Sequence, residues 1–152
     1  MNFQHVSHLL HRTALVLAAL LLLALAASAA KAQPAPEEPA GPHDVVLLVR
    51  TPRHLDAALK TAAELQTGDA FETGRIEVIV CGEASAALQA GSDRAPALRE
   101  AAARGVTITA CGMSLASAGI DPSALADVVR VVPNGLVRAL QLQAEGYLSV
   151  EL

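Results

Sequence analysis

Val45-Val46-Leu47-Leu48-Val49 is the stretch of sequence that decides the fold. All five residues are aliphatic, and the run has the length of a strand rather than of a helix. A strand with one face in water alternates apolar and polar residues, whereas a strand that is covered on both faces is apolar throughout. The run therefore predicts a buried strand in a parallel sheet that has helices on both faces.

The segments that follow this run alternate between helical and strand patterns. Leu55, Leu59 and Ala62 recur at the spacing of one helix face. Alternation of this kind is typical of βαβ units, in which helices join parallel strands. The strands are expected over 45–49, 76–80, 106–110, 128–132 and 147–151, and the helices over 53–66, 95–104, 114–118 and 134–145, with a short helix or loop over 84–90.

The composition is uneven along the 152 residues. The chain is 53% hydrophobic, and 22 of its first 32 residues are hydrophobic. The formal net charge is −4; because two Lys/Arg and no Asp/Glu lie before residue 33, the remainder has a charge of −6. The chain has no Trp, one Tyr and two Phe. An acidic chain with few aromatic rings is a poor candidate for binding nucleic acid, which requires basic faces and stacking rings.

Residues 1–32 have the pattern of an export signal. His11-Arg12 precedes an uncharged apolar run, 14–27, and the segment 30–32 (Ala-Lys-Ala) fits the small-x-small rule for cleavage. The segment 27–29 (Ala-Ser-Ala) is an alternative site. The run is shorter than the ~20 residues of a bilayer span, so we expect a cleaved signal peptide rather than a membrane anchor. The predicted compartment is the periplasm, and no stable membrane span is expected after cleavage.

Residues 33–43 form a separate segment between the signal and the folded part. This segment holds four of the eight prolines of the chain. Proline lacks the backbone N–H that helices and sheets require, and such a composition favours disorder. We therefore expect a disordered linker over 33–43 and one folded domain over 44–152.

Cys111 is the best candidate for chemistry. It ends a predicted strand at the carboxyl edge of the sheet, where parallel α/β proteins form their sites. Backbone N–H groups at the start of the following helix stabilise a thiolate, the reactive form of cysteine. Gly112 lets the backbone turn and a partner approach. Buried cysteines are also common inert core residues, so the pattern leaves both interpretations open.

Cys81 ends the preceding predicted strand in the same way. Two cysteines in an exported protein raise the question of a disulfide. If the first strand lies between the other two, the cysteines are roughly 10 Å apart, whereas a disulfide needs Cα atoms within about 7 Å. We therefore expect two free thiols rather than a bridge.

No metal or cofactor is expected. His43 and His54 are the only histidines after residue 32, and both are expected in solvent. The chain has no CxxC, GxGxxG or GxxxxGK[ST] motif, which argues against thioredoxin chemistry, a zinc ribbon and a nucleotide site. Gly112 and Gly135 each open a predicted helix, where backbone N–H groups could bind an anion.

Four ordered segments of the C-terminal part together resemble the DsrE/DsrF-like family, also called DsrEFH-like. They are 106–115 (VTITACGMSL), 119–120 (GI), 131–136 (VVPNGL) and 142–147 (LQAEGY). The resemblance covers the whole predicted domain. It implies a three-layer α/β/α sandwich with a mostly parallel sheet of about five strands. It also implies assembly into a homo-oligomer, as a trimer or a hexamer.

The resemblance further implies a role for Cys111. Sulfur-relay members of the family hold sulfur as a persulfide on the cysteine that ends the third strand, which corresponds to Cys111. They exchange this sulfur with donor and acceptor proteins. Gly112, Met113, Asn134 and Gly135 are the residues expected to bind a ligand or to support the thiolate.

Two features depart from the family pattern. Cys81 stands where many members have a His-Gly or similar pair, and it is a candidate second thiol. The export signal differs from the best-known relay members, which are cytoplasmic. The leading hypothesis is a periplasmic sulfur carrier or sulfurtransferase-like protein that holds a persulfide on Cys111. The alternative is a non-catalytic oligomeric module that binds a small ligand or is structural, with Cys111 inert.

Overall fold

The computed structural model describes residues 41–68 and 71–152. The predicted signal peptide and most of the predicted linker lie outside these residues. Within them, no helix has the length and apolar character needed to cross a bilayer. The elements in chain order are β1 (His43–Val49), α2 (Pro52–Thr67), β2 (Thr73–Val80), the 3-10 helix η1 (Gly82–Leu88), α3 (Ala95–Ala103), β3 (Thr107–Cys111), α4 (Gly112–Ala118), the 3-10 helix η2 (Pro122–Ala124), β4 (Val129–Val132), α5 (Gly135–Ala144) and β5 (Leu148–Glu151).

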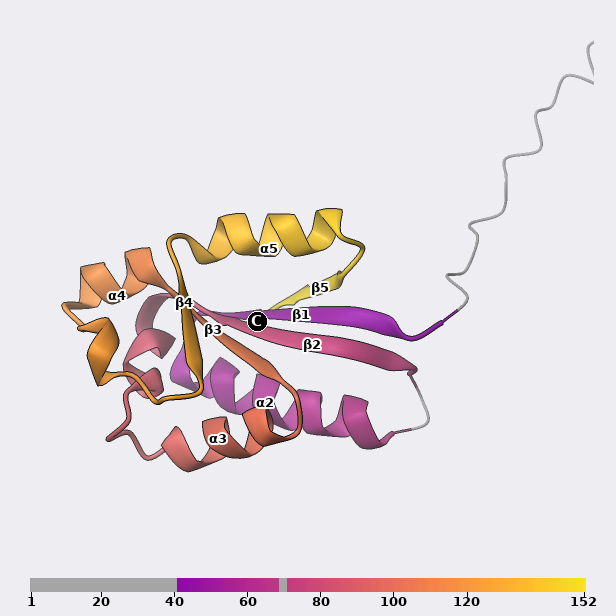
Figure 1. Ribbon diagram of the computed structural model, residues 1–152, viewed down its shortest axis with the longest axis horizontal. Helices are drawn as coiled ribbons and strands as arrows, with labels where there is room; N and C mark the ends of the chain where they lie inside the picture. The colour runs from indigo at the N-terminus through magenta and orange to yellow at the C-terminus, as the bar shows by residue number, and fades with distance from the viewer. Residues whose placement is uncertain (1–40, 69–70) are drawn as a thin grey trace, which may run out of the picture. The chain divides into compact units, whose positions relative to one another are not determined.

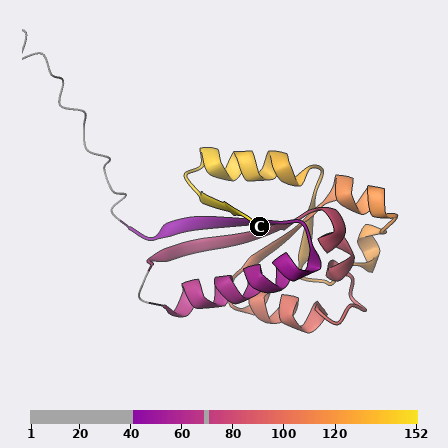
Figure 2. The same ribbon diagram turned by 180° about the vertical axis from the view of Figure 1, so that it is seen from behind.

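The five strands form one parallel sheet in the order β4-β3-β2-β1-β5. From β1 to β4 the chain crosses the sheet in one direction, and it then returns past β3, β2 and β1 to reach β5. Because crossover connections are right-handed, the return places α5 on the face opposite α2 and α3. Figure 1 shows α5 above the sheet with α2 and α3 below it, and Figure 2 shows the same layers from behind. The predicted three-layer α/β/α fold is confirmed.

The apolar run of β1 contributes to both cores, as its sequence predicts. Val45, Leu47 and Val49 belong to the larger apolar cluster, which the sheet shares with α2 and α3. Val46 and Leu48 point the other way, into a smaller cluster beneath α5. All five side chains are at most 5% exposed. The strand is therefore buried on both faces, which explains why no polar residue interrupts it.

The start of β1 corrects the expectation for the two histidines. β1 begins at His43, the last residue of the predicted linker, and the His43 ring stacks on Phe71 with centroids 5.1 Å apart. His54 lies in the first turn of α2, where its backbone N–H donates to Thr51 Oγ1 at 3.2 Å. Both histidines are half-buried rather than in solvent, because each contributes to the start of an element.

A partly buried ion pair attaches α5 to the sheet. Glu77 lies in the middle of β2 and is 5% exposed. Its carboxylate accepts from Thr109 Oγ1 at 2.8 Å and from Arg138 Nε and Nη2 at 3.1 and 2.8 Å. A bidentate arginine contact fixes both distance and orientation. Arg138 is three residues after Gly135, so the pair also positions the first turn of α5 over the sheet.

Candidate functional site

The two cysteines lie side by side at the carboxyl edge of the sheet. Val80 pairs in register with Ala110, so Cys81 and Cys111 follow on neighbouring strands. The condition under which the cysteines would be roughly 10 Å apart is not met, because β1 pairs with the other edge of β2 and does not lie between β2 and β3. Neighbouring strands are about 4.8 Å apart. Both cysteines are free thiols, and both belong to the apolar cluster beneath α5.

The sulfur of Cys111 accepts a hydrogen bond from the start of α5. The backbone N–H of Gly135, the first residue of α5, donates to Cys111 Sγ at 3.2 Å. Asn134 caps the helix, because its Oδ1 accepts from the N–H of Leu136 at 2.9 Å. The Cys111 sulfur and the Asn134 side chain thus accept hydrogen bonds from two adjacent N–H groups at the N-terminus of α5. The N-terminus of a helix carries a partial positive charge, which favours a negative charge on the sulfur.

Ser114 completes the surroundings of Cys111, and it was not among the predicted site residues. Its Oγ accepts from the N–H of Gly82 at 2.9 Å, and both its hydroxyl and its backbone N–H lower the pKa of the Cys111 thiol by hydrogen bonding. The hydroxyl also lowers the pKa of Cys81. The signal for Ser114 is the spacing, since a residue three positions after Cys111 on a helix lies on the same face. The sequence alone does not show that Gly82, on the neighbouring strand connection, orients this hydroxyl.

The two thiols differ in their tendency to ionise. Burial raises the pKa of the Cys111 thiol, but hydrogen bonds from the Gly135 N–H, Ser114 and Cys81 outweigh it and bring the pKa below 9.0. Burial, and then the charge and hydrogen bonding of Cys111, raise the pKa of Cys81 to about 12. Near neutral pH, Cys111 is therefore the more easily formed thiolate, and Cys81 stays protonated beside it.

Two glycines make the close packing at this edge feasible. A Cβ on Gly135 would stand 2.8 Å from Cys81 Sγ and 3.1 Å from Cys111 Cβ, and a Cβ on Gly112 would stand 3.0 Å from the carbonyl oxygen of Val132. Both positions therefore require glycine for close approach.

The predicted supporting residues have different contacts. Gly135 bonds to the Cys111 sulfur, whereas Asn134 acts through the helix cap. Gly112 and Met113 form the junction with the next strand, since the N–H of Met113 donates to the carbonyl oxygen of Pro133 at 3.2 Å. The Met113 side chain is 59% exposed.

Access to the cysteines is narrow. The relative exposure is 4% for Cys111 and 6% for Cys81. Arg50, at the end of β1, contributes a positive charge that opposes the effect of burial on the pKa of Cys81, and its Nε also bonds to Glu151 Oε1 at 2.9 Å. The site is therefore an enclosed thiol pair with a cation beside it.

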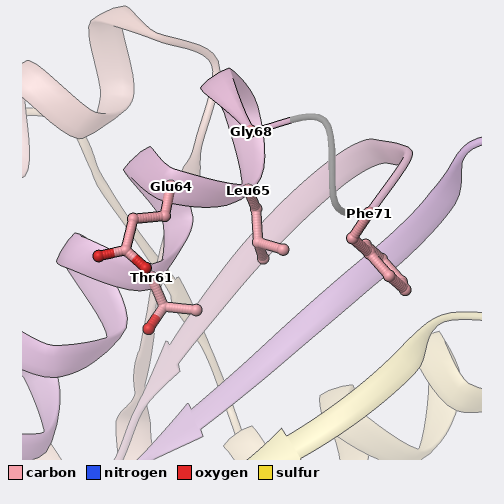
Figure 3. A pocket seen from close by; sticks show the side chains of 5 residues that line it. All are labelled: Thr61, Glu64, Leu65, Gly68 and Phe71. Atoms are coloured by element: carbon pink, nitrogen blue, oxygen red, sulfur yellow. The ribbon is translucent and has the colours of Figure 1, made fainter.

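Elsewhere the described residues offer little for ligand chemistry. They contain no group of three or more His, Cys, Asp and Glu residues that could hold a metal. A hollow of about 250 Å³ at the end of α2 is lined by Thr61, Glu64, Leu65, Gly68 and Phe71, whose positions Figure 3 shows. This hollow lies at the amino edge of the sheet, away from both cysteines.

The fold and the site together define a class of protein. It is a three-layer α/β/α domain with a parallel sheet, in which the cysteine at the carboxyl end of the third strand accepts a hydrogen bond from the N-terminus of a helix. The chain belongs to the DsrE/DsrF-like family, whose sequence model matches residues 18–150. This match confirms the resemblance found in the sequence. No curated protein matches the chain significantly.

One solved structure with a similar fold is MTH1491 from Methanobacterium thermoautotrophicum, a protein of unknown function. The two chains are 23% identical, with a TM-score of 0.66, and the similarity covers 72% of this chain and 99% of the other. At this level of identity the comparison supports the three-layer fold.

Gly135→Ala tests the packing of α5 against the cysteines. The added Cβ would stand 2.8 Å from Cys81 Sγ, so we expect a loss of about 1–3 kcal/mol in the free energy of unfolding, as overpacked cores show. The displaced N–H would also stabilise the Cys111 thiolate less, so the pKa of Cys111 should rise. Urea unfolding and the pH midpoint of Cys111 alkylation measure the two effects.

Gly91→Ala is the matched control, because nothing lies within 4 Å of a Cβ at Gly91. The control should leave both measurements close to those of the unchanged protein. Equal behaviour of the two variants would contradict the packing described here.

Proposed function

We propose that the protein takes up sulfane sulfur as a persulfide on Cys111 and passes it on, as a sulfur carrier or sulfurtransferase-like protein. Membership of the DsrE/DsrF-like family supports a role related to sulfur relay. The observation that supports Cys111 as the acceptor is the 3.2 Å hydrogen bond from the Gly135 N–H to its sulfur. This bond favours the thiolate, which is the nucleophile in sulfur exchange.

Loading and unloading are two exchange reactions at sulfur. In loading, the Cys111 thiolate attacks the outer sulfur of a donor persulfide, the S–S bond of the donor breaks, and the donor leaves as a thiolate. In unloading, an acceptor thiolate attacks the outer sulfur on Cys111, and Cys111 leaves as the thiolate. One neutral sulfur atom is transferred in each step, and the protein returns to its starting state.

The enclosure of Cys111 favours a small donor. Only 4% of the residue surface is exposed, and Arg50 at the same edge is paired with Glu151. A low-molecular-weight persulfide or polysulfide fits such an approach better than a cysteine on the surface of a folded partner, because it is small enough to reach an enclosed thiol.

The two single-cysteine variants test the assignment. Cys81→Ser retains only Cys111, and we expect it to gain about 32 Da, one sulfur atom, after treatment with cysteine persulfide. Cys111→Ser retains only the protonated Cys81 and should gain nothing. Intact-mass spectrometry measures both, and cyanide should remove the added sulfur as thiocyanate.

Circular dichroism confirms that both variants are folded before the comparison. An unchanged mass of folded Cys81→Ser, or an equal gain in Cys111→Ser, would overturn the proposal.

The second candidate function is a non-catalytic oligomeric module that binds a small ligand or is structural, with an inert Cys111. The observation in its favour is the burial of both cysteines, since enclosed thiols are often only core residues. Under this alternative, both single-cysteine variants keep their masses in the experiment above.

We further propose that the protein acts in the periplasm as a homo-oligomer. The export pattern of residues 1–32 supports the compartment. Apolar side chains that are 44–64% exposed support self-association, because large exposed apolar areas mark interfaces. These side chains are Val131, Leu136, Val137, Leu140, Leu148 and Val150. Three of them lie on α5, and the other three lie on the edge strands β4 and β5, in register with residues of the cluster on the α2 and α3 face.

Native mass spectrometry of the protein isolated from its own cells measures both properties at once. We expect a subunit mass that begins at Gln33, or at Ala30 for the alternative cleavage site, and an assembly of three or six copies. A subunit that retains residue 1 would contradict export with cleavage, and a monomer would contradict the oligomer.

A further inference from the structure

The feature that the proposed function leaves unused is the second thiol. Cys81 occupies the strand position beside Cys111, and both side chains pack against Gly135, where an added Cβ would stand 2.8 Å from Cys81 Sγ and 3.1 Å from Cys111 Cβ. We propose that Cys81 resolves the persulfide on Cys111, so that the sulfur leaves as hydrogen sulfide and a Cys81–Cys111 disulfide remains. This inference rests on the proposed function, because it needs a persulfide on Cys111.

The geometry of the strand ends permits the bond. Neighbouring strands place facing Cα atoms about 4.8 Å apart, and disulfides join Cα atoms roughly 4.4–6.8 Å apart. Pairing between β2 and β3 ends at Val80 and Ala110. Beyond that point Cys81 leads into η1 and Cys111 into α4. The two side chains are therefore neighbours at the end of the β2–β3 ladder, where Cys111 pairs with Val132 of β4 and the Cys81 N–H donates to the carbonyl oxygen of Val49 at 2.9 Å.

Enclosure makes Cys81 the nearest acceptor for the persulfide. Cys111 is 4% exposed, so an external protein thiol reaches its sulfur only after the site opens. Cys81 is already inside, and two groups held side by side react far faster than the same groups free in solution. Burial thus disfavours transfer to a large acceptor and favours attack by the internal thiol.

The step is balanced in atoms and electrons. The outer sulfur of the persulfide bears the negative charge and takes the proton of the Cys81 thiol. The Cys81 sulfur then attacks the Cys111 sulfur, the persulfide S–S bond breaks, and the outer sulfur leaves as hydrosulfide. The outer sulfur is reduced by two electrons, which come from Cys81 and Cys111 as they form the disulfide. An external dithiol reductant then returns both cysteines to thiols and becomes a disulfide itself.

The different protonation of the two thiols suits these separate tasks. The pKa of Cys81 is about 12, so Cys81 does not compete with Cys111 for the donor. Loading moves the negative charge from the Cys111 sulfur to the outer sulfur, which removes part of the repulsion that keeps Cys81 protonated. Cys81 also brings the proton that turns the departing sulfur into a better leaving group.

The test compares the unchanged protein with Cys81→Ser after one equivalent of cysteine persulfide in the absence of a reductant. The unchanged protein should lose about 2 Da, contain a peptide that joins Cys81 to Cys111, and release one equivalent of sulfide. Cys81→Ser should keep a stable persulfide, about 32 Da heavier, and release no sulfide above a protein-free blank. Attack at the outer sulfur of cysteine persulfide releases cysteine, whereas attack at its inner sulfur would release sulfide and leave a cysteine adduct of about 119 Da. A mass gain of about 32 Da in Cys81→Ser, without that adduct, therefore assigns the sulfide above the blank to the second step.

The outcomes separate the two proposals. If the unchanged protein keeps its persulfide as long as Cys81→Ser does, with no joined peptide, the resolving role of Cys81 is wrong while the function of Cys111 stands. If neither protein takes up sulfur, the proposed function itself is wrong. The joined peptide is measured on the unchanged protein, so the test remains valid if Cys81→Ser does not fold.

Discussion

The site depends on one contact between layers, the hydrogen bond from the Gly135 N–H to the Cys111 sulfur. The donor belongs to α5 and the acceptor lies at the end of β3. The bond forms because the chain, after β4, crosses back over the sheet on the face opposite α2 and α3, which places the start of α5 beside Cys111 (Figure 1). The ion pair of Arg138 with buried Glu77 fixes α5 one turn further along. Glycine at position 135 lets the helix approach both thiols, since a Cβ would meet the Cys81 sulfur.

The fold follows from sequence because its signals are local. The unbroken apolar run of β1 indicates a strand with two covered faces, and the alternation of strand and helix patterns indicates parallel pairing. The position of Cys111 at the end of a strand is likewise predicted from neighbouring residues, because it directly follows the strand pattern of 106–110 and precedes Gly112. The resemblance to the DsrE/DsrF-like family added the chemistry expected of Cys111, since the apolar run had already predicted helices on both faces of the sheet.

The parts that sequence missed depend on pairing between distant segments. The order of the strands decides whether Cys81 lies beside Cys111, and no local pattern specifies that order. Ser114 becomes a partner of the thiol because Gly82, from another connection, orients its hydroxyl. Glu77 did leave a signal, because a carboxylate inside an apolar strand requires a buried partner, but the sequence does not identify Arg138 as that partner.

The central claim is that one thiol of the pair ionises easily while its neighbour stays protonated. Ultraviolet absorbance of the thiolate, followed over a pH titration of the folded protein and of its two single-cysteine variants, measures this most directly. We predict that Cys111 ionises at a lower pH than an ordinary cysteine, that this ionisation is absent from Cys111→Ser, and that Cys81 ionises only near pH 12. A low ionisation that persists in Cys111→Ser, or two thiols that titrate together near their ordinary pKa, would contradict the claim.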